Sequence, residues 1–303
     1  MSLAPVCLID ASIYIFRYYF SMPPNWFCQD NGYSTETVYG YTNFLLGFME
    51  RHNPRWVAAC FDESLGSGFR HQLSPDYKAS RALPDEALAF QLEACKTATQ
   101  LLGLRTFASD AYEADDLLAS LYRDCAADEG AIALLSRDKD LGQVLTREQD
   151  FLWDYSGDRK HYLADIETRF GVSSAQMADL QALVGDPSDD IAGVPGVGLK
   201  TAAALLNQGR SLQQLLQNPQ QIADFPIRGA RTLAVKVAQF TPQIELALSL
   251  VTLKADLALI SERNDISRRV PDILAFTDFC QRMGWPAVAK RAQRLIDVQD
   301  EYQ

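Results

Sequence analysis

Acidic residues recur in this sequence in five short segments whose positions suggest a shared chemical task. Some follow apolar runs, others open an amphipathic segment, and the last group follows a glycine. The set comprises Asp10, Asp62, Glu113, Asp115, Asp116, Asp138, Asp140, Asp186 and Asp189. Carboxylates brought together at this density repel and raise one another's pKa unless cations neutralise them. Hard oxygen ligands of this kind favour Mg²⁺ or Mn²⁺.

Two such ions, held roughly 4 Å apart, can activate a water molecule and stabilise the leaving oxygen of a phosphodiester. The set therefore predicts metal-dependent hydrolysis without a side-chain nucleophile. Taken singly, each acid is equally well explained as a helix cap or a solvated strand-end residue, so the prediction depends on the whole set. An EF-hand calcium site is not indicated, because no segment has the twelve-residue ligand pattern.

Alternating apolar runs and amphipathic segments indicate the elements that position these acids. Buried strands are predicted at residues 6–9, 56–61 and 131–136, and helices at residues 38–50, 85–102 and 114–126. This alternation is typical of an α/β fold with a central, mostly parallel sheet flanked by helices. Ligands gather at the carboxyl ends of strands in such sheets, where Asp10, Asp62 and Asp138 are expected.

Two domains are predicted, with a boundary near residue 175. Residues 1–175 form the α/β core, from which the polar stretch at about 65–90 departs as a loop or mobile excursion. Residues 176–303 form a mainly helical region.

A glycine-rich turn precedes an Ala/Leu-rich helix within residues 191–206. Gly196 and Gly198 permit a tight turn, and the helix that follows carries Lys200 in its first turn. Backbone amides at a helix N-terminus suit phosphate, so this segment predicts sequence-independent DNA contact. An ordinary helical hairpin with a glycine turn remains the alternative.

The excursion contains basic and aromatic residues suited to single-stranded nucleic acid. Arg70, Lys78 and Arg81 are predicted to contact phosphates, and Tyr77 to stack on an unpaired base. A merely solvated basic loop explains the same residues equally well.

Composition leaves a nucleic-acid partner open. The chain has 303 residues, 48% of them hydrophobic, and a net charge of −11. Removing the nine acids above and Asp190 from the 39 acidic residues leaves 29, against 28 lysines and arginines. A nearly neutral body can still carry a basic patch. No signal peptide or membrane helix is indicated, and a cytoplasmic protein is expected. The six scattered cysteines indicate neither zinc nor disulfides.

Six motifs together resemble the 5′ nucleases, the family that includes the N-terminal domain of bacterial DNA polymerase I, phage 5′ exonucleases and flap endonucleases. They are LIDAS at residues 8–12, ACFD at 59–62, YKASR at 77–81, YEADD at 112–116, SRDKDL at 136–141 and VGDPSDDIAGVPGVG at 184–198. With LVTLKAD at 250–256, the resemblance covers nearly the whole chain and is close to the polymerase I branch. Because no polymerase domain follows, a stand-alone nuclease with a PIN-like or resolvase-like core is expected.

The resemblance also implies roles for the acids. One metal ion would be bound by Asp10, Asp62, Glu113 and Asp115, and the second by Asp138, Asp140, Asp186 and Asp189. Asp116 would assist through water.

For DNA binding, the resemblance implies that Arg17, Arg70, Lys78 and Arg81 contact phosphates and that residues 65–90 belong to an arch for the single-stranded 5′ end. Residues 180–206 would contain a helix-three-turn-helix element. Its backbone carbonyls, at about Ile191, Val194 and Val197, would bind K⁺.

The resulting hypothesis is a structure-specific 5′-3′ exonuclease and 5′-flap endonuclease in DNA replication or repair. Its substrates would be DNA with a 5′ flap or 5′ end at a duplex junction, or an RNA primer on DNA, and replication or repair proteins are possible partners. No membrane partner is expected. The alternatives are a catalytically inactive DNA-junction binding protein and a PIN-like ribonuclease. Metal-dependent turnover would distinguish the nuclease from the inactive junction-binding protein. Competition between flapped DNA and single-stranded RNA would distinguish it from the ribonuclease.

Overall fold

The computed structural model describes residues 4–64 and 66–300, with side chains up to residue 295. The chain divides into two compact units. The first unit comprises Met1–Leu65, Leu83–Arg137 and Ala255–Gln303. The second unit comprises Gly66–Ala82 and Asp138–Lys254. Each unit is therefore built from segments that are distant in the sequence.

A parallel sheet forms the centre of the first unit, in the strand order β3-β2-β1-β4. Its strands are β1 (Val6–Asp10), β2 (Val57–Asp62), β3 (Arg105–Ser109) and β4 (Ile132–Leu135). Every residue of β1 and β4 is buried, as expected for strands covered on both faces. In the register, Asp10 lies opposite Cys60, and Asp62 opposite Ser109. Both acids thus end parallel strands.

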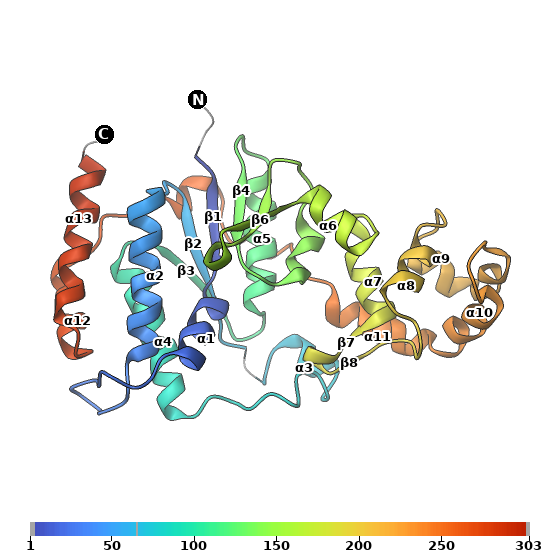
Figure 1. Cartoon of the computed structure of the whole chain (residues 1–303), viewed down its shortest axis with the longest axis horizontal. Coiled ribbons are helices and arrows are strands. Elements are labelled where there is room, and N and C mark those ends of the chain that lie inside the picture. Colours follow the sequence, from blue (N-terminus) through green and yellow to red (C-terminus); the bar gives the residue numbers. More distant parts are fainter. Residues whose placement is uncertain (1–3, 65, 301–303) are drawn as a thin grey trace. The chain divides into compact units, whose positions relative to one another are not determined.

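Helices cover the two faces of this sheet. The first unit contains α1 (Ala11–Ser21), α2 (Glu36–His52), α4 (Glu86–Leu101), α5 (Ala114–Ala126), η6 (Arg263–Ile266), α12 (Ile273–Arg282), η7 (Pro286–Val288) and α13 (Ala289–Asp300). Helix α5 packs against β1, β2 and β3, while α2 lies on the other side of the sheet and contacts α1 and α4 (Figure 1). Asp85 caps α4 by accepting a hydrogen bond from the Leu88 amide.

The last segment of the chain returns to the first unit. Trp56 donates a hydrogen bond from its indole nitrogen to Asn264 Oδ1 at 3.3 Å. Helix α12 contacts α4, and α13 contacts α2. The segment after residue 254 therefore completes the core around the sheet.

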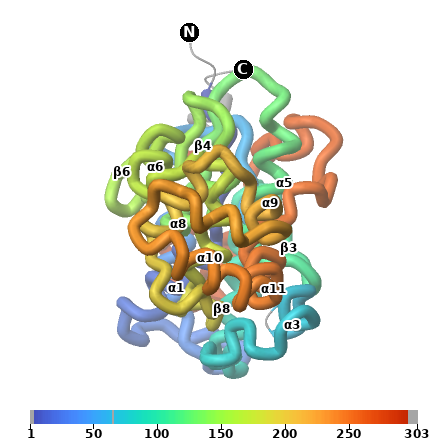
Figure 2. The backbone as a smooth tube through the Cα atoms, turned by 90° about the vertical axis from the view of Figure 1, so that its right-hand side faces the viewer, coloured from blue at the N-terminus to red at the C-terminus, as the bar shows by residue number. Residues whose placement is uncertain are grey.

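The second unit is mainly helical. Its elements are α3 (Phe69–Leu73), η1 (Lys139–Val144), β5 (Phe151–Asp154), η2 (Tyr155–Gly157), β6 (Arg159–Tyr162), α6 (Leu163–Phe170), η3 (Ser174–Gln176), α7 (Met177–Val184), β7 (Gly185–Asp186), η4 (Pro187–Asp189), β8 (Ile191–Ala192), α8 (Leu199–Leu206), α9 (Leu212–Gln217), η5 (Pro219–Asp224), α10 (Ala230–Gln239) and α11 (Thr241–Val251). Strands β5 and β6 form an antiparallel hairpin, as do β7 and β8. Figure 2 presents α8, α9 and α10 toward the viewer.

The structure confirms the predicted fold class, the three predicted strands and the three predicted helices. Helix α5 has the predicted bounds, and α2 and α4 begin and end within two residues of the prediction. The stretch predicted as a loop contains the short helix α3, which contacts α11. Among the described residues, no helix is long and apolar enough to span a membrane.

Candidate active site

Asp10 occupies the end of β1 and the N-cap of α1. Its Oδ1 accepts a hydrogen bond from the Ile13 amide at 3.3 Å, and its Oδ2 accepts one from Ser136 Oγ at 2.9 Å. The residue is 3% exposed. A backbone amide and a serine hydroxyl thus orient both oxygens of this carboxylate, which suits a ligand of a cation.

Asp62 ends the neighbouring strand and joins it to α5. Its Oδ1 accepts a hydrogen bond from the Ala114 amide at 2.7 Å. Burial, followed by the charges of Asp10, Asp62 and Asp115, raises the pKa of the Cys60 thiol well above its ordinary value. Three of the predicted acids therefore concentrate negative charge around one buried side chain of β2.

The acids at the start of α5 have different environments. Glu113 is the N-cap, and its own amide donates a 3.1 Å hydrogen bond to Asp116 Oδ2 in a capping box. Asp116 is fully buried. Its carboxylate thus helps to start α5, and the water-mediated role at a metal that the resemblance implies stays a prediction. Asp115 and Glu113 are half-buried.

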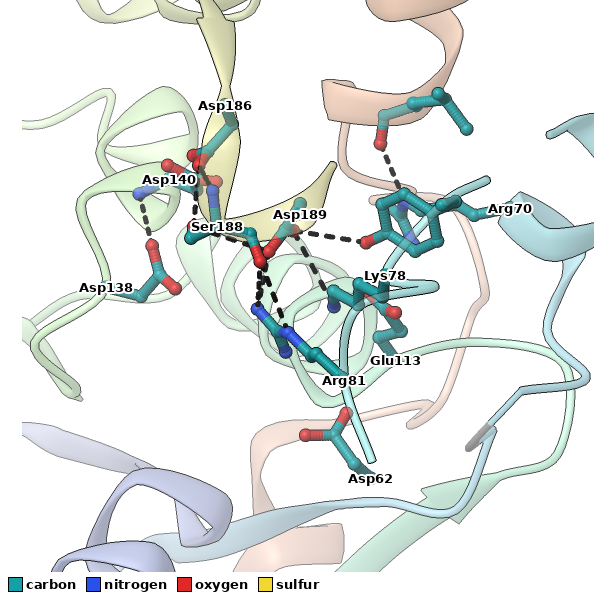
Figure 3. A network of polar contacts seen from close by, with 12 residues as sticks. Asp62, Arg70, Lys78, Arg81, Glu113, Asp138, Asp140, Asp186, Ser188 and Asp189 are labelled. Atoms are coloured by element: carbon teal, nitrogen blue, oxygen red, sulfur yellow. Dashed lines mark hydrogen bonds and ion pairs between the residues drawn. The ribbon is translucent and has the colours of Figure 1, made fainter. Parts of the chain in front are cut away.

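In the second unit, three further acids lie around the start of η1. Asp138 accepts a 2.8 Å hydrogen bond from the Asp140 amide. The Lys139 Nζ lies 3.1 Å from Asp140 Oδ1 and 2.7 Å from Asp186 Oδ2. Figure 3 shows Asp140 beside Asp186, the carboxylates that this ammonium joins. The predicted acids of η1 and β7 are therefore brought together.

Asp140 and Asp186 have pKa values displaced in opposite directions. Burial and the nearby Asp138 carboxylate raise the pKa of Asp140 to about 6, against the opposing effect of Lys139. For Asp186, burial raises the pKa, but hydrogen bonds from Lys139 and Ser188 outweigh it and leave the pKa below its ordinary value. The charge of Asp140 is thus only partly compensated.

Asp189 is contacted by the basic segment that the sequence assigned to phosphate binding. Arg81 forms an ion pair with Asp189 Oδ1, and Lys78 Nζ lies 3.7 Å from Oδ2 (Figure 3). The Lys78 amide also donates to the Asp189 carbonyl at 3.0 Å. Lys78 and Arg81 therefore compensate a carboxylate of their own unit. The Arg81 side chain remains 53% exposed.

Two predicted DNA-contacting residues in this segment, Arg70 and Tyr77, are buried. Arg70 is 3% exposed and donates hydrogen bonds to the carbonyls of Leu250 at 2.6 Å and Thr252 at 3.3 Å. Tyr77 is 2% exposed, and its hydroxyl donates to Asp189 at 3.3 Å. In this structure the protein surrounds both side chains, and their contact with DNA stays a prediction.

The glycine-rich turn has buried apolar residues and exposed glycines. Ile191, Val194 and Val197 are buried, whereas Gly196, Gly198 and Lys200 are exposed. Gly198 is the N-cap of α8, and a Cβ atom added there would meet no atom within 4 Å. Arg17 is exposed on α1 in the first unit.

Close backbone approach fixes the base of this turn. A Cβ atom on Gly193 would lie 2.0 Å from the Val184 carbonyl oxygen, so only glycine fits. Lys236 Nζ donates to the Pro195 carbonyl at 2.6 Å, and Gln243 donates to the Gly193 carbonyl at 2.8 Å. The Val194 carbonyl accepts the Val197 amide at 2.9 Å. Side chains of α10 and α11 thus hold the turn through its carbonyl groups.

The donor set fits an open metal site rather than a closed one. Across the part of the chain that the structure describes, no three Asp, Glu, His or Cys side chains are close enough to hold a metal ion by themselves. Mg²⁺ commonly keeps several waters and uses only one or two carboxylates together with substrate phosphate. Asp140 and Asp186 already share one cation, the Lys139 ammonium. A pair of this kind fits a hydrated divalent ion.

Some residues of the site were not found from the sequence. Ser136 orients Asp10, Lys139 bridges two acids, and Ser188 donates to Asp186 from both its amide and its hydroxyl. Lys139 was visible as the basic residue between Asp138 and Asp140. Nothing in the sequence indicated which acids it would contact.

Comparison with known proteins agrees with this fold. The N-terminal resolvase-like domain of the 5′-3′ exonucleases matches residues 5–171, and their C-terminal SAM fold matches residues 172–273. The protein therefore belongs to the 5′-3′ exonuclease family of 5′ nucleases.

Relatives include both long and short proteins. DNA polymerase I of Pseudomonas aeruginosa is 34% identical over 86% of this chain and 28% of its own length. The 5′-3′ exonuclease of Buchnera aphidicola is 26% identical over 86% of this chain and 91% of its own length. This chain thus spans less than a third of the Pseudomonas polymerase.

A flap endonuclease of bacteriophage T5, solved with DNA and metal ions in a pseudo-enzyme–product complex, has the same fold. It is 18% identical, with a TM-score of 0.64 over 98% of this chain and 99% of its own.

Proposed function

We propose that this protein is a metal-dependent, structure-specific 5′ nuclease that acts on DNA as a 5′-3′ exonuclease and 5′-flap endonuclease. The observation that carries the proposal is the placement of Asp10 and Asp62 at the ends of the neighbouring parallel strands β1 and β2, in a chain of this family. A second group of acids around η1 supports it.

The proposed two-metal mechanism uses two groups of carboxylate ligands. Asp10, Asp62, Glu113 and Asp115 would hold one divalent ion, and Asp138, Asp140, Asp186 and Asp189 would hold the other. Bound Mg²⁺ or Mn²⁺ would supply an activated water and stabilise the negative charge of the departing 3′ oxygen.

The protein's own groups would orient these ligands. Ser136 and the Ile13 amide hold the Asp10 carboxylate, and the Ala114 amide holds Asp62. The Asp140 amide holds Asp138 in the second unit. Fixed ligands of this kind limit the reorganisation needed during the reaction.

Exposed groups would bind the DNA. We assign phosphate contacts to Arg17, Lys78 and Arg81, and to the turn that contains Gly196, Gly198 and Lys200. The turn would act without reading sequence, because its amides and ammonium recognise phosphate oxygen. Arg81 keeps half of its side chain exposed beside Asp189, so it can contact a phosphate after exchanging that partner.

We also propose a monovalent ion, substrates and a place of action for the protein. K⁺ would bind carbonyls of the turn near Ile191, Val194 and Val197. The substrates would be flapped DNA, 5′ ends at duplex junctions and RNA primers on DNA. Proteins of replication or repair would be its partners. The proposed place of action is the cytoplasm.

The decisive experiment uses a 5′-end-labelled DNA flap with Mg²⁺, with chelator, and with Asp138→Asn. We expect junction-proximal products from the unaltered protein in Mg²⁺ and no cleavage in chelator. Asp138→Asn should lose cleavage but keep flap binding, because the amide still accepts the hydrogen bond that starts η1. Single-stranded RNA of equal length serves as a competing substrate.

Asp154→Asn is the matched control. Asp154 also caps a 3-10 helix of the second unit, and its Oδ1 accepts the Gly157 amide at 3.1 Å. This variant should cleave as the unaltered protein does. Tight flap binding without any cleavage would instead indicate a junction-binding protein, and preferential cleavage of the RNA would indicate a ribonuclease.

A further inference from the structure

Lys139 occupies the place of a cation between two carboxylates that we assign to one metal ion, so the inference rests on the proposed function. Its Nζ is 2.7 Å from Asp186 Oδ2 and 3.1 Å from Asp140 Oδ1. Both distances correspond to direct contact between charged groups. One positive charge is therefore built into the Asp140–Asp186 pair.

Neutral donors hold the two carboxylates around this ammonium. Gln181 Nε2 donates to Asp140 Oδ1. Ser188 donates to Asp186 Oδ1 from its amide at 2.9 Å and from its hydroxyl at 2.6 Å. These contacts leave Asp186 Oδ2 directed at Lys139 Nζ. The pair is thus arranged around a cation by residues of α7 and η4.

A divalent ion and the Lys139 ammonium cannot use the same oxygens together. Mg²⁺ requires oxygen ligands at roughly 2.0–2.1 Å, and two cations within a few ångströms repel strongly at a site shielded from water. Lys139 has a flexible four-carbon stem and a side chain that is 41% exposed. It can therefore move into solvent when another cation arrives.

We propose that Lys139 is a tethered counterion, which holds Asp140 and Asp186 together in the metal-free protein and competes with a divalent ion for them. Asp10 and Asp62 are fixed by a hydroxyl and by backbone amides, which remain in place when an ion binds. Because an incoming ion has to displace Lys139, we assign the weaker class of sites to Asp140 and Asp186.

The test measures Mn²⁺ binding to the full chain without DNA, by the loss of the electron paramagnetic resonance signal of free Mn²⁺. In Lys139→Met we expect the weaker class of sites to tighten about tenfold, equivalent to ~1.4 kcal/mol, with the stronger class unchanged. The melting temperature in chelator should fall, because two carboxylates then face each other without a counterion. Its rise on adding saturating Mn²⁺ should exceed that of the unaltered protein.

Lys160→Met is the matched control for the loss of one positive charge in the same unit. Lys160 Nζ lies 4.7 Å from the ring centre of Phe151 and 4.8 Å from that of Trp153, on the β5–β6 hairpin. Its removal should leave both classes of Mn²⁺ sites unchanged. Lys139→Gln provides a second variant, which removes the charge but keeps a polar group and should shift Mn²⁺ binding in the same direction as Lys139→Met.

The outcomes separate this inference from the proposed function. Unchanged or weaker Mn²⁺ binding in both Lys139 variants, with normal binding by the unaltered protein, would overturn the tethered counterion alone. Absence of any Mn²⁺ binding by the unaltered protein would overturn the metal sites on which it depends. Selective tightening of the weaker class would support it.

Discussion

The acids of the two units are held by different kinds of partner, although the sequence presents them as one set. In the first unit, Asp10 and Asp62 accept hydrogen bonds from backbone amides and a serine hydroxyl. In the second, ammonium and guanidinium groups contact Asp140, Asp186 and Asp189. The acids of the second unit therefore have cationic partners that an added metal ion would have to displace.

This difference determines what a metal ion must do at each place. Neutral donors orient a carboxylate while leaving its charge, so an added cation gains the full electrostatic attraction. Cationic partners stabilise the metal-free protein but have to be displaced by an incoming ion. A protein that uses both can keep one group of ligands ready and the other closed until metal or substrate is present.

The largest expected effect comes from Asp10, which accepts hydrogen bonds from a backbone amide and a serine hydroxyl. Asp10→Asn should lower flap cleavage by at least about a hundredfold, because even groups that merely support a metal ligand commonly contribute 10- to 100-fold. The melting temperature in chelator should fall less than in Asp10→Ala, since the asparagine keeps an acceptor for the Ile13 amide. Cleavage kinetics and thermal unfolding of the same samples provide the measurement.

Two variants show whether this result is specific. Asp272 caps α12 by accepting the Ala275 amide at 3.0 Å, so Asp272→Asn makes the same chemical change away from the acidic set and should retain cleavage. Asp10→Ala loses the cap of α1 and should lower the free energy of unfolding by about 1 kcal/mol. A fall in stability for Asp10→Asn as large as for Asp10→Ala would contradict the proposed role of the neutral donors.

In the second unit, the incomplete compensation of Asp140 predicts a pH effect. Burial and Asp138 raise the pKa of Asp140 from 3.8 to about 6 in the folded protein. A carboxyl group with a raised pKa stabilises the fold when protonated. This contribution is fully present below the unfolded value and is lost as the pH rises through 6. In chelator, lowering the pH from 7 to 5 should therefore raise the free energy of unfolding by on the order of 1 kcal/mol.

Denaturant unfolding at both pH values, in chelator, tests this prediction. Asp140→Asn should remove the contribution, because an amide does not titrate and still accepts from Gln181. The change in the free energy of unfolding between pH 7 and pH 5 is compared in the unaltered protein and the variant. Subtracting one change from the other cancels the titration of groups that both proteins share. Equal pH dependence of the two proteins would contradict the incomplete compensation of the Asp140 charge.

The sequence predicted the first unit better than the second, for a physical reason. Strands β1, β2 and β4 are buried on both faces and therefore appear as continuous apolar runs. Strand β3 is half-buried, and β6 consists of Arg, Lys, His and Tyr, so neither has such a run. The predicted boundary near residue 175 also gave no indication that residues after 254 pack against the first unit.

In the candidate site too, contacts between residues distant in the sequence were not predicted. The types and order of the acids were visible because motifs are local, but their partners lie far away in the sequence. Ser136 contacts Asp10 across 126 positions, and Arg70 contacts Leu250 across 180. Arg70 and Tyr77 were predicted from their types to contact DNA, whereas tertiary packing buries both. Residue type indicated the chemistry, and burial decided which residues are available for it.

The smallest expected effect concerns Arg81, the exposed cationic partner of the second unit. Arg81→Met should change the free energy of unfolding by less than about 1 kcal/mol, because ion pairs at exposed side chains contribute little. If Arg81 contacts a phosphate, the variant should bind every flap sequence more weakly, and the slope of log affinity against log salt should fall by about 1. Fluorescence anisotropy over a salt series measures both.

Arg70→Met provides the contrast within the same segment. It removes buried donors from the carbonyls of Leu250 and Thr252 and should lower the free energy of unfolding by about 1–3 kcal/mol. Its salt slope should match that of the unaltered protein under conditions where it is folded, because a buried guanidinium releases no counterions from DNA. A reduced slope for Arg70→Met, or an unchanged slope for Arg81→Met, would show that burial in the free protein does not decide which cations of this segment reach the phosphates.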